Sequence, residues 1–210
     1  LLPPETAKDI QFLNAQRVQR LSNLLHNFAG ITPCLVPQGL QASLRDYQLQ
    51  GLSWLNFLRE YGLGGILADD MGLGKTLQTL SLLLLQKQRG ELQHPALIIC
   101  PTSVLGNWLA EAARFTPQLR VLQIHGNKRQ PLFNELANYD LLVTSYPLVV
   151  RDHKYYQNQP LSAVILDEAQ HIKNAGSLAA KAVRLLKADF KLALSGTPLE
   201  NHLGELKSIF

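Results

Sequence analysis

The sequence predicts an α/β domain in which helices cover both faces of a parallel β-sheet. From Gly64 onward, short apolar runs alternate with stretches that have helical spacing. Strands that are apolar along their whole length are typical of parallel sheets, because both of their faces are buried. The expected strands span residues 66–68, 96–100, 121–124, 141–144, 163–166 and 192–194.

Helical patterns occupy the chain between most of these strands. Apolar residues recur there at the spacing of one helical face, and the expected helices span 75–86, 104–114 and 177–187. A further amphipathic helix is expected over 44–58, before the first strand. Ligands of such sheets bind beyond the carboxyl ends of the strands, so functional residues are expected in the loops that follow strands.

The beginning of the chain has a different character. Apolar side chains at helical spacing predict a helix within residues 5–28, and the Gly and Pro residues between 30 and 39 interrupt it. We therefore expect an N-terminal helix with its connector over residues 1–39 and the α/β domain over residues 40–210.

Composition narrows the class of protein. The chain has 210 residues, of which 46% are hydrophobic and 17% charged, as in folded globular domains. Its most apolar run, Leu80 to Leu85, is far shorter than the roughly 20 residues that a membrane span requires. Cys34 and Cys100 have no metal-ligand spacing, which argues against a zinc site and for a reducing, intracellular environment.

The only methionine of the sequence, Met71, is internal, so we expect the chain to be a piece of a longer protein.

A candidate phosphate-binding loop follows the first strand. Its residues are Asp69, Asp70, Met71, Gly72, Leu73, Gly74, Lys75 and Thr76. Glycines let backbone N–H groups wrap a phosphate, the lysine reaches the β- and γ-phosphates, and the threonine hydroxyl suits Mg²⁺. Asp69 stands where the usual pattern has its first glycine, and a Gly-Lys-Thr triplet also occurs by chance. The preceding strand and the following helix favour the phosphate loop.

An acidic pair follows the strand expected over residues 163–166. Asp167 at a strand end can hold Mg²⁺, and Glu168 can orient the water that attacks a γ-phosphate. The alternative is that both carboxylates merely favour the start of a helix. A third polar turn, residues 195–198, ends the last expected strand with Ser-Gly-Thr-Pro.

The order of these three motifs resembles motifs I, II and III of superfamily-two helicases and translocases, whose first lobe is RecA-like. Residues 44–55 (LRDYQLQGLSWL) and 67–76 (LADDMGLGKT) are similar to the Swi/Snf family in particular, where an acid at Asp69 is usual. Further similar segments are PTS at 101–103, NW at 107–108, TSY at 144–146, HIKN at 171–174 and LEN at 199–201. The resemblance covers roughly residues 40 to 210.

The resemblance assigns the nucleotide-binding roles and implies ATP with Mg²⁺ as ligands. Gln48 matches the glutamine on the adenine side, whose amide can both donate to and accept from the base edge. Lys75 and Thr76 carry the phosphate and metal roles, Asp167 the metal role and Glu168 the water-orienting role.

The resemblance also assigns residues that couple the site to movement. Gln170, where many relatives have histidine, and Ser195 and Thr197 of the third motif occupy these positions. Thr102, Ser103 and Ser145 match segments that touch the phosphate backbone of DNA, and Lys173 could add charge there.

The function implied is that of the first lobe of an ATP-driven translocase on double-stranded DNA. Such binding is expected to be independent of base sequence and weakened by salt. A second RecA-like lobe of the same polypeptide would supply an arginine finger, and DNA-bound proteins would be displaced. Alternatives are an RNA helicase, a restriction-type translocase, or an interaction module that binds nucleotide without turnover. Short insertions between the motifs favour a bacterial, cytoplasmic protein over a nuclear one.

Overall fold

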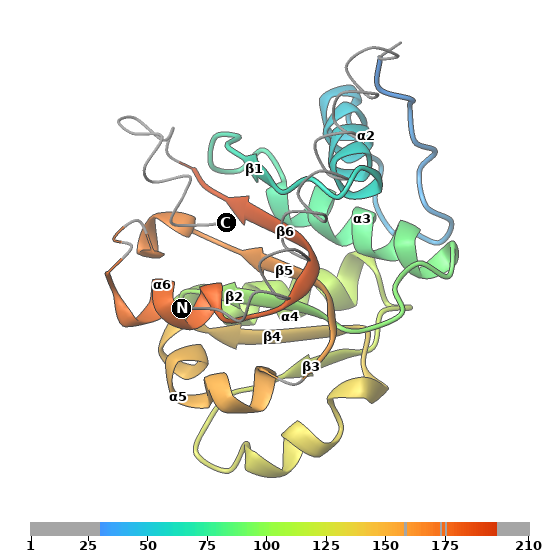
Figure 1. Ribbon diagram of the computed structural model, residues 1–210. Coiled ribbons are helices and arrows are strands. Elements are labelled where there is room, and N and C mark those ends of the chain that lie inside the picture. Colours follow the sequence, from blue (N-terminus) through green and yellow to red (C-terminus); the bar gives the residue numbers. More distant parts are fainter. Residues whose placement is uncertain (1–29, 158, 173, 175, 197–210) are drawn as a thin grey trace, which may run out of the picture. The chain divides into compact units, whose positions relative to one another are not determined.

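The computed structural model describes residues 30–157, 159–172, 174 and 176–196 (Figure 1). A six-stranded sheet forms its centre, with the order β1-β6-β5-β2-β4-β3 and every pair of neighbours parallel. The strands are β1 (Gly65–Leu67), β2 (Ala96–Cys100), β3 (Val121–Gln123), β4 (Leu141–Ser145), β5 (Leu161–Leu166) and β6 (Ala188–Leu194). The parallel sheet predicted from the apolar runs is confirmed. The expected N-terminal helix, Lys173 and Thr197 lie outside the described residues.

Helices alternate with these strands along the chain. They are α2 (Asp46–Glu60), α3 (Lys75–Gln88), α4 (Leu105–Phe115), α5 (Tyr146–Tyr156) and α6 (Leu178–Arg184), with 3-10 turns that include η1 (Thr102–Val104) and η4 (Ala169–Ile172). Of the five α-helices in the described part of the chain, the sequence patterns predicted four and missed α5. That helix mixes apolar and charged residues and begins with a proline in its first turn, so its periodicity is weak. Helix α6 ends earlier than expected, at Arg184.

The two faces of the sheet are covered by different helices (Figure 1). Alternate strand residues such as Ile98 and Val143 belong to a core shared with α2, α3 and α4. Their neighbours Leu97 and Leu142 belong to a second core shared with α5 and α6. This alternation follows from the two-residue period of a strand. The sheet is therefore the middle layer of three, as the sequence predicts.

Helix α3 is the most deeply buried helix of the domain. Each leucine from Leu82 to Leu85, and Leu80 before them, is at most 6% exposed. The helix contacts α2 and α4 as well as the core of the sheet, so it has apolar neighbours on several sides. Among the described residues, no helix combines the length and apolar character needed to cross a membrane.

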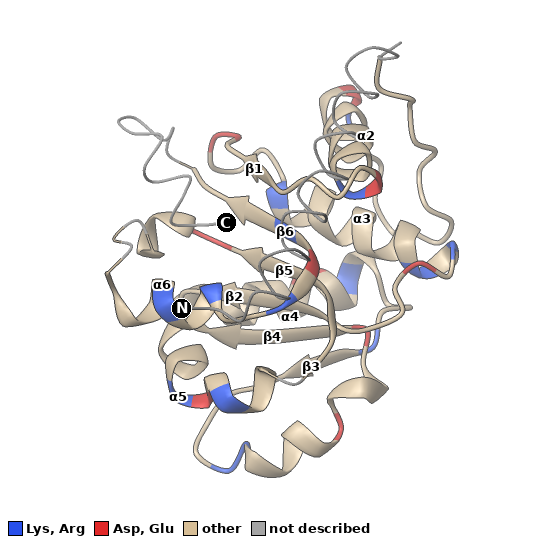
Figure 2. Ribbon diagram, viewed as in Figure 1, with Lys and Arg blue, Asp and Glu red and all other residues tan. Residues whose placement is uncertain are grey.

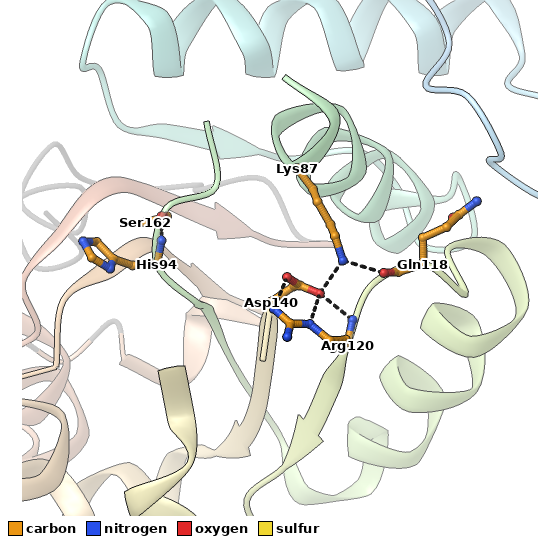
Figure 3. Close-up of polar contacts among 6 residues, drawn as sticks. All are labelled: Lys87, His94, Gln118, Arg120, Asp140 and Ser162. Carbon is orange, nitrogen blue, oxygen red and sulfur yellow. Dashed lines mark hydrogen bonds and ion pairs between the residues drawn. The ribbon is translucent and has the colours of Figure 1, made fainter. Parts of the chain in front are cut away.

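Polar contacts tie the strands together at their amino ends (Figure 3). Asp140, just before β4, accepts hydrogen bonds from Lys87 Nζ at 2.7 Å and from the backbone N–H of Arg120 at 2.7 Å. The Arg120 guanidinium also contacts both of its carboxylate oxygens at 3.2 Å. Burial alone raises the pKa of Asp140, but the bonds from Arg120 and Lys87 outweigh it and lower that pKa. Nearby, the Ser162 hydroxyl accepts a bond from the His94 backbone at 3.0 Å.

The segment before α2 is irregular, as predicted, and is held by the helices. The compact unit that contains the sheet begins at Pro33. Within it, the backbone N–H of Cys34 donates to the Ser53 hydroxyl of α2 at 2.9 Å. The N–H of Gln41 donates to the carbonyl of Phe115, the last residue of α4, at 2.8 Å. Residues 33–41 are thus held within this unit by hydrogen bonds that their backbone N–H groups donate.

Candidate nucleotide-binding site

The loops that follow the strands meet at one edge of the sheet because all strands are parallel. Acidic stretches after β1 and β5 lie on this same side (Figure 2). The ladder continues one residue beyond the strands, since the Ser195 N–H donates to the Leu67 carbonyl at 3.1 Å and the Asp167 N–H to the Ile99 carbonyl at 2.9 Å. Asp167, the first residue of the acidic motif, is therefore held by the neighbouring strand β2. Ser195, the first residue of the Ser-Gly-Thr-Pro turn, is held in the same way by β1.

The loop between β1 and α3 has the backbone of a phosphate-binding loop. Gly72 and Gly74 have φ angles of 83° and 81°, in the left-handed region that favours glycine. Gly74 caps the start of α3, and the next residue, Lys75, donates from Nζ to the carbonyls of Asp69 at 2.6 Å and Asp70 at 3.1 Å. The ammonium group therefore lies within the loop, beside the N-terminus of a helix whose dipole favours anions.

Asp69, the departure from the usual glycine pattern, has a structural partner. Its Oδ2 accepts a hydrogen bond of 3.0 Å from Nε2 of Gln78, one turn into α3. Gln78 is fully buried, so this bond joins the start of the loop to the helix that follows it. A glycine at this position would leave the Gln78 amide without that acceptor.

Gln48 of α2 contacts the phosphate loop directly. Its Nε2 donates to the Leu73 carbonyl at 3.1 Å, and its Oε1 accepts from the Arg45 backbone N–H at 3.0 Å. A Cβ atom built on Gly74 would lie 2.5 Å from the same Nε2. The residue predicted to face adenine thus lies against the loop, and its role toward the base stays a prediction.

Asp167 is held by donors from three directions. Its Oδ2 accepts from Nε1 of Trp108 in α4 at 2.8 Å, and its Oδ1 accepts from the backbone N–H of Glu168 at 3.0 Å. Its backbone carbonyl accepts from the hydroxyl of Tyr146, the first residue of α5, at 2.8 Å. The carboxylate is therefore fixed in orientation before any ligand binds.

The surroundings of Asp167 are negatively charged and poorly solvated. Burial, and then the Glu168 charge, raise the pKa of Asp167 against the opposing effects of the Trp108 bond and the Lys75 charge. Burial and the Asp167 charge raise the pKa of Glu111 in α4 and raise that of the Cys100 thiol to about 12. These shifts share two causes, which are burial and the concentration of negative charge around Asp167.

Glu168 and the residues of the third motif form a continuous chain of contacts. Glu168 is the only described non-glycine residue with positive φ, at 50°, a conformation that is rare for a side chain of this kind. Gln170 Nε2 donates to Glu168 Oε2 at 2.6 Å, and the Ser195 hydroxyl lies 3.4 Å from Gln170 Oε1. A Cβ on Gly196 would lie 2.8 Å from the Met71 side chain, so the third motif touches the phosphate loop.

The residues expected to meet DNA fall in different environments. Thr102 and Ser103 of η1 are exposed, whereas Ser145 is buried at 1% exposure. The burial of Ser145 at the end of β4 argues against a direct contact from its hydroxyl. Thr102 lines a groove of ≈ 580 Å³ that also has Arg151 and His171 on its walls.

Sequence reasoning missed the roles of Trp108 and Tyr146. Both lie in segments that resemble the family, yet nothing in their spacing showed that they contact Asp167. The available signal was chemical, since buried indole N–H and phenol O–H groups usually have hydrogen-bond partners. Which partner they would take depends on the packing of α4 and α5 on the sheet.

Comparison with known proteins shows the family of this chain. The family model of the SNF2-related domain matches residues 47–210. A Bacillus subtilis protein, YwqA, whose name describes an ATP-dependent helicase/translocase, is 43% identical over 96% of this chain, which spans 22% of its length. The Arabidopsis thaliana ISWI chromatin-remodeling complex ATPase CHR17 is 43% identical over 81% of this chain, which spans 16% of its length.

A solved structure shows the same fold. The Sulfolobus solfataricus SWI2/SNF2 ATPase core in complex with dsDNA matches with a TM-score of 0.77 and 43% identity over 83% of this chain and 36% of that one. The relatives include bacterial and plant proteins, so bacterial origin stays a prediction. The fold, the ordered motifs and these matches agree: the chain belongs to the SNF2-related family.

Proposed function

We propose that this chain is the nucleotide-binding lobe of an ATP-driven translocase on double-stranded DNA. The observation that carries the proposal is the meeting of Lys75 with the pair Asp167–Glu168 at one edge of the sheet. A Cβ atom built on Gly196 would lie 3.9 Å from Lys75 Nζ, and the adjacent Ser195 is linked through Gln170 to Glu168. An ammonium group beside a helix N-terminus and carboxylates at the end of β5, two strands away from β1 in the sheet, suit a nucleoside triphosphate with its metal ion.

The residues of the site fit ATP and Mg²⁺. The N–H groups between Gly72 and Thr76, with the Lys75 ammonium, would bind the β- and γ-phosphates. The Thr76 hydroxyl and the Asp167 carboxylate are oxygen ligands of the kind Mg²⁺ prefers, and each Asp167 carboxylate oxygen has lone-pair capacity beyond the hydrogen bond from Trp108 or Glu168. When bound, Mg²⁺ would neutralise charge on the phosphates. Glu168, oriented by Gln170, would orient the attacking water.

The proposed binding of DNA rests on exposed residues of η1 and on the groove beside them. Thr102 and Ser103 offer hydroxyl and backbone donors, and Arg151 and His171 in the adjoining groove add positive or titratable groups. Such contacts would hold the DNA backbone without reading bases. The Sulfolobus relative was solved with dsDNA, which supports duplex DNA over RNA. Lys173 remains a proposed contact outside the described residues.

Turnover and movement would need more than this chain. We infer that a second RecA-like lobe of the same polypeptide contributes an arginine finger, worth about 10³ to 10⁵ in rate. Gln170, Ser195 and Thr197 would couple the two lobes, and DNA-bound proteins would be displaced as the enzyme moves. The isolated lobe should then bind nucleotide and hydrolyse it slowly or not at all.

The test is ATP hydrolysis by the full-length protein that contains this chain, with and without duplex DNA, at low and high salt. Duplex DNA should stimulate hydrolysis, high salt should abolish the stimulation, and Glu168→Gln should abolish turnover while nucleotide still binds. Glu135→Gln, at an exposed glutamate outside the site, is the matched control. Stimulation by RNA alone would support an RNA helicase. Binding without turnover under every condition would support an interaction module.

A further inference from the structure

Two aromatic side chains from opposite faces of the sheet converge on one residue of the site. Trp108 of α4 donates to the Asp167 carboxylate and Tyr146 of α5 to the Asp167 carbonyl, each at 2.8 Å. Both are buried, at 1% and 5% exposure. Trp108 belongs to the core beside α3, and Tyr146 to the core beside α6.

These contacts determine where the free lone pairs of Asp167 point. Trp108 occupies one acceptor position on Oδ2 and the Glu168 N–H occupies one on Oδ1. An ionised carboxylate has about four such positions, so roughly half remain, in directions that the bound donors define. Donors to a metal-binding carboxylate typically fix its orientation and affect metal affinity about 10-fold to 100-fold.

Each aromatic residue also follows a segment for which the sequence predicts a contact with DNA. Thr102–Val104 runs directly into α4, which carries Trp108, and Ser145 immediately precedes Tyr146. Helix α4 contacts both η1 and β4. A displacement of either segment would therefore be passed to Asp167 through one rigid aromatic side chain.

We propose that Trp108 and Tyr146 are positioning residues that orient Asp167 for the metal ion and connect the segments at Thr102 and Ser145 to the ATP site. The connection to DNA rests on the proposed function, whereas the orientation of Asp167 does not. At Tyr146, packing alone would be satisfied by phenylalanine, which lacks only the O–H group. At Trp108, phenylalanine lacks the N–H group and also part of the ring volume, so its effect on stability is measured separately.

The first test measures ADP binding to this chain by calorimetry, with and without Mg²⁺. The variants are Trp108→Phe and Tyr146→Phe, and the controls are Trp54→Phe in α2 and Tyr156→Phe in α5. In Trp108→Phe, the Kd of ADP without Mg²⁺ should stay unchanged. The factor by which Mg²⁺ tightens ADP binding should fall about 10-fold. Tyr146→Phe should show a smaller loss, because Tyr146 holds the backbone rather than the carboxylate.

Several outcomes of this calorimetry would contradict the positioning role of Trp108. An unchanged gain from Mg²⁺ in Trp108→Phe, or a wild-type chain without any such gain, would overturn the positioning role. Equal weakening of binding with and without Mg²⁺ would show a packing role only. A thermal unfolding scan of each variant establishes that it folds.

A second measurement does not depend on a variant of Trp108. The indole N–H of Trp108 gives its own NMR signal, distinguished from that of Trp54 by the Trp54→Phe variant. Adding ADP and Mg²⁺, or substituting Asp167→Asn, should shift this signal and leave the Trp54 signal in place. A Trp108 signal that responds to neither change would overturn the contact.

The DNA connection is tested in the full-length protein. Trp108→Phe should bind duplex DNA like the wild type yet lose about 10-fold of the DNA-stimulated ATPase rate. Full stimulation in the variant would overturn the connection. If the wild type itself shows no stimulation by DNA, the proposed function fails, and the Mg²⁺ result still decides the positioning role.

Discussion

The Gln48 side chain in α2 donates a hydrogen bond of 3.1 Å to the carbonyl oxygen of Leu73, in the middle of the phosphate loop. Tyr47 donates to the same oxygen from its hydroxyl at 3.2 Å. The other end of the Gln48 amide accepts from the Arg45 N–H at the start of α2. One side chain therefore joins the beginning of a helix to a loop that lies 25 residues later in the chain.

Loss of the Gln48 amide should weaken nucleotide binding. Each of its two bonds is worth about 1 kcal/mol, so Gln48→Ala should raise the Kd of ADP about 5-fold to 10-fold by releasing the loop. Calorimetry on this chain measures the change. Gln50→Ala, at an exposed glutamine of the same helix, should leave Kd unaltered. Equal Kd values for the two variants would contradict a role of Gln48 in the loop.

Gly74→Ala should destabilise the domain, whereas Gly106→Ala should not. At φ 81° an alanine costs about 1–2 kcal/mol, and its Cβ would displace Gln48 Nε2. Gly106 lies inside α4 with nothing within 4 Å of a built Cβ, so alanine there should stabilise by up to about 1 kcal/mol. Urea unfolding of both variants gives the two free energies. A change of the unfolding free energy in the same direction for both variants would contradict backbone strain at Gly74.

The ion pairs of Asp140 should make stability depend on pH. Because the folded state lowers the pKa of Asp140, its contribution is present above the unfolded pKa of about 3.9 and is lost as pH falls through the lower folded pKa. Asp140→Asn should cost about 2 kcal/mol at neutral pH, and the difference from wild type should narrow below about pH 4. Unfolding at several pH values tests this. The exposed Asp189→Asn should show little effect at any pH.

Arg151 in the groove beside Thr102 should contribute to DNA binding through its charge. Arg151→Ala should lower the slope of log affinity against log salt for duplex DNA by about 0.9, the value of one phosphate contact. Fluorescence anisotropy with this chain at several salt concentrations measures the slope. Lys154→Ala, at an exposed lysine of the same helix, should leave it unchanged. Equal losses in both variants would show general charge attraction in place of a defined contact.

The parallel sheet and most of its helices could be predicted because their signal is local. Burial on both faces makes a run such as residues 96–100 apolar throughout, and the structure places β2 there. Helix α5 could not be predicted, since its buried Val149 and Tyr156 are mixed with Arg151, His153 and Lys154. Its place is determined by packing on the sheet.

The candidate site could likewise be predicted only in part from the sequence. Lys75, Asp167 and Glu168 could be proposed from the sequence because their motifs come after strands, and parallel strands bring their carboxyl ends together. The partners of Asp167 could not be found in this way. Trp108 lies 59 positions earlier and Tyr146 21 positions earlier, and only the packing of two helix layers brings one to the carboxylate and the other to the backbone carbonyl of Asp167.

That arrangement makes Asp167 sensitive to the spacing between layers. Trp108 reaches it from the helices on one face of the sheet and Tyr146 from those on the other. If the α4 layer slid along the sheet by the length of one hydrogen bond, the strands would remain paired and the carboxylate would turn, whereas a shift of the α5 layer would pull on the backbone that carries it. The orientation of the proposed metal ligand would therefore be lost before the pairing of the strands.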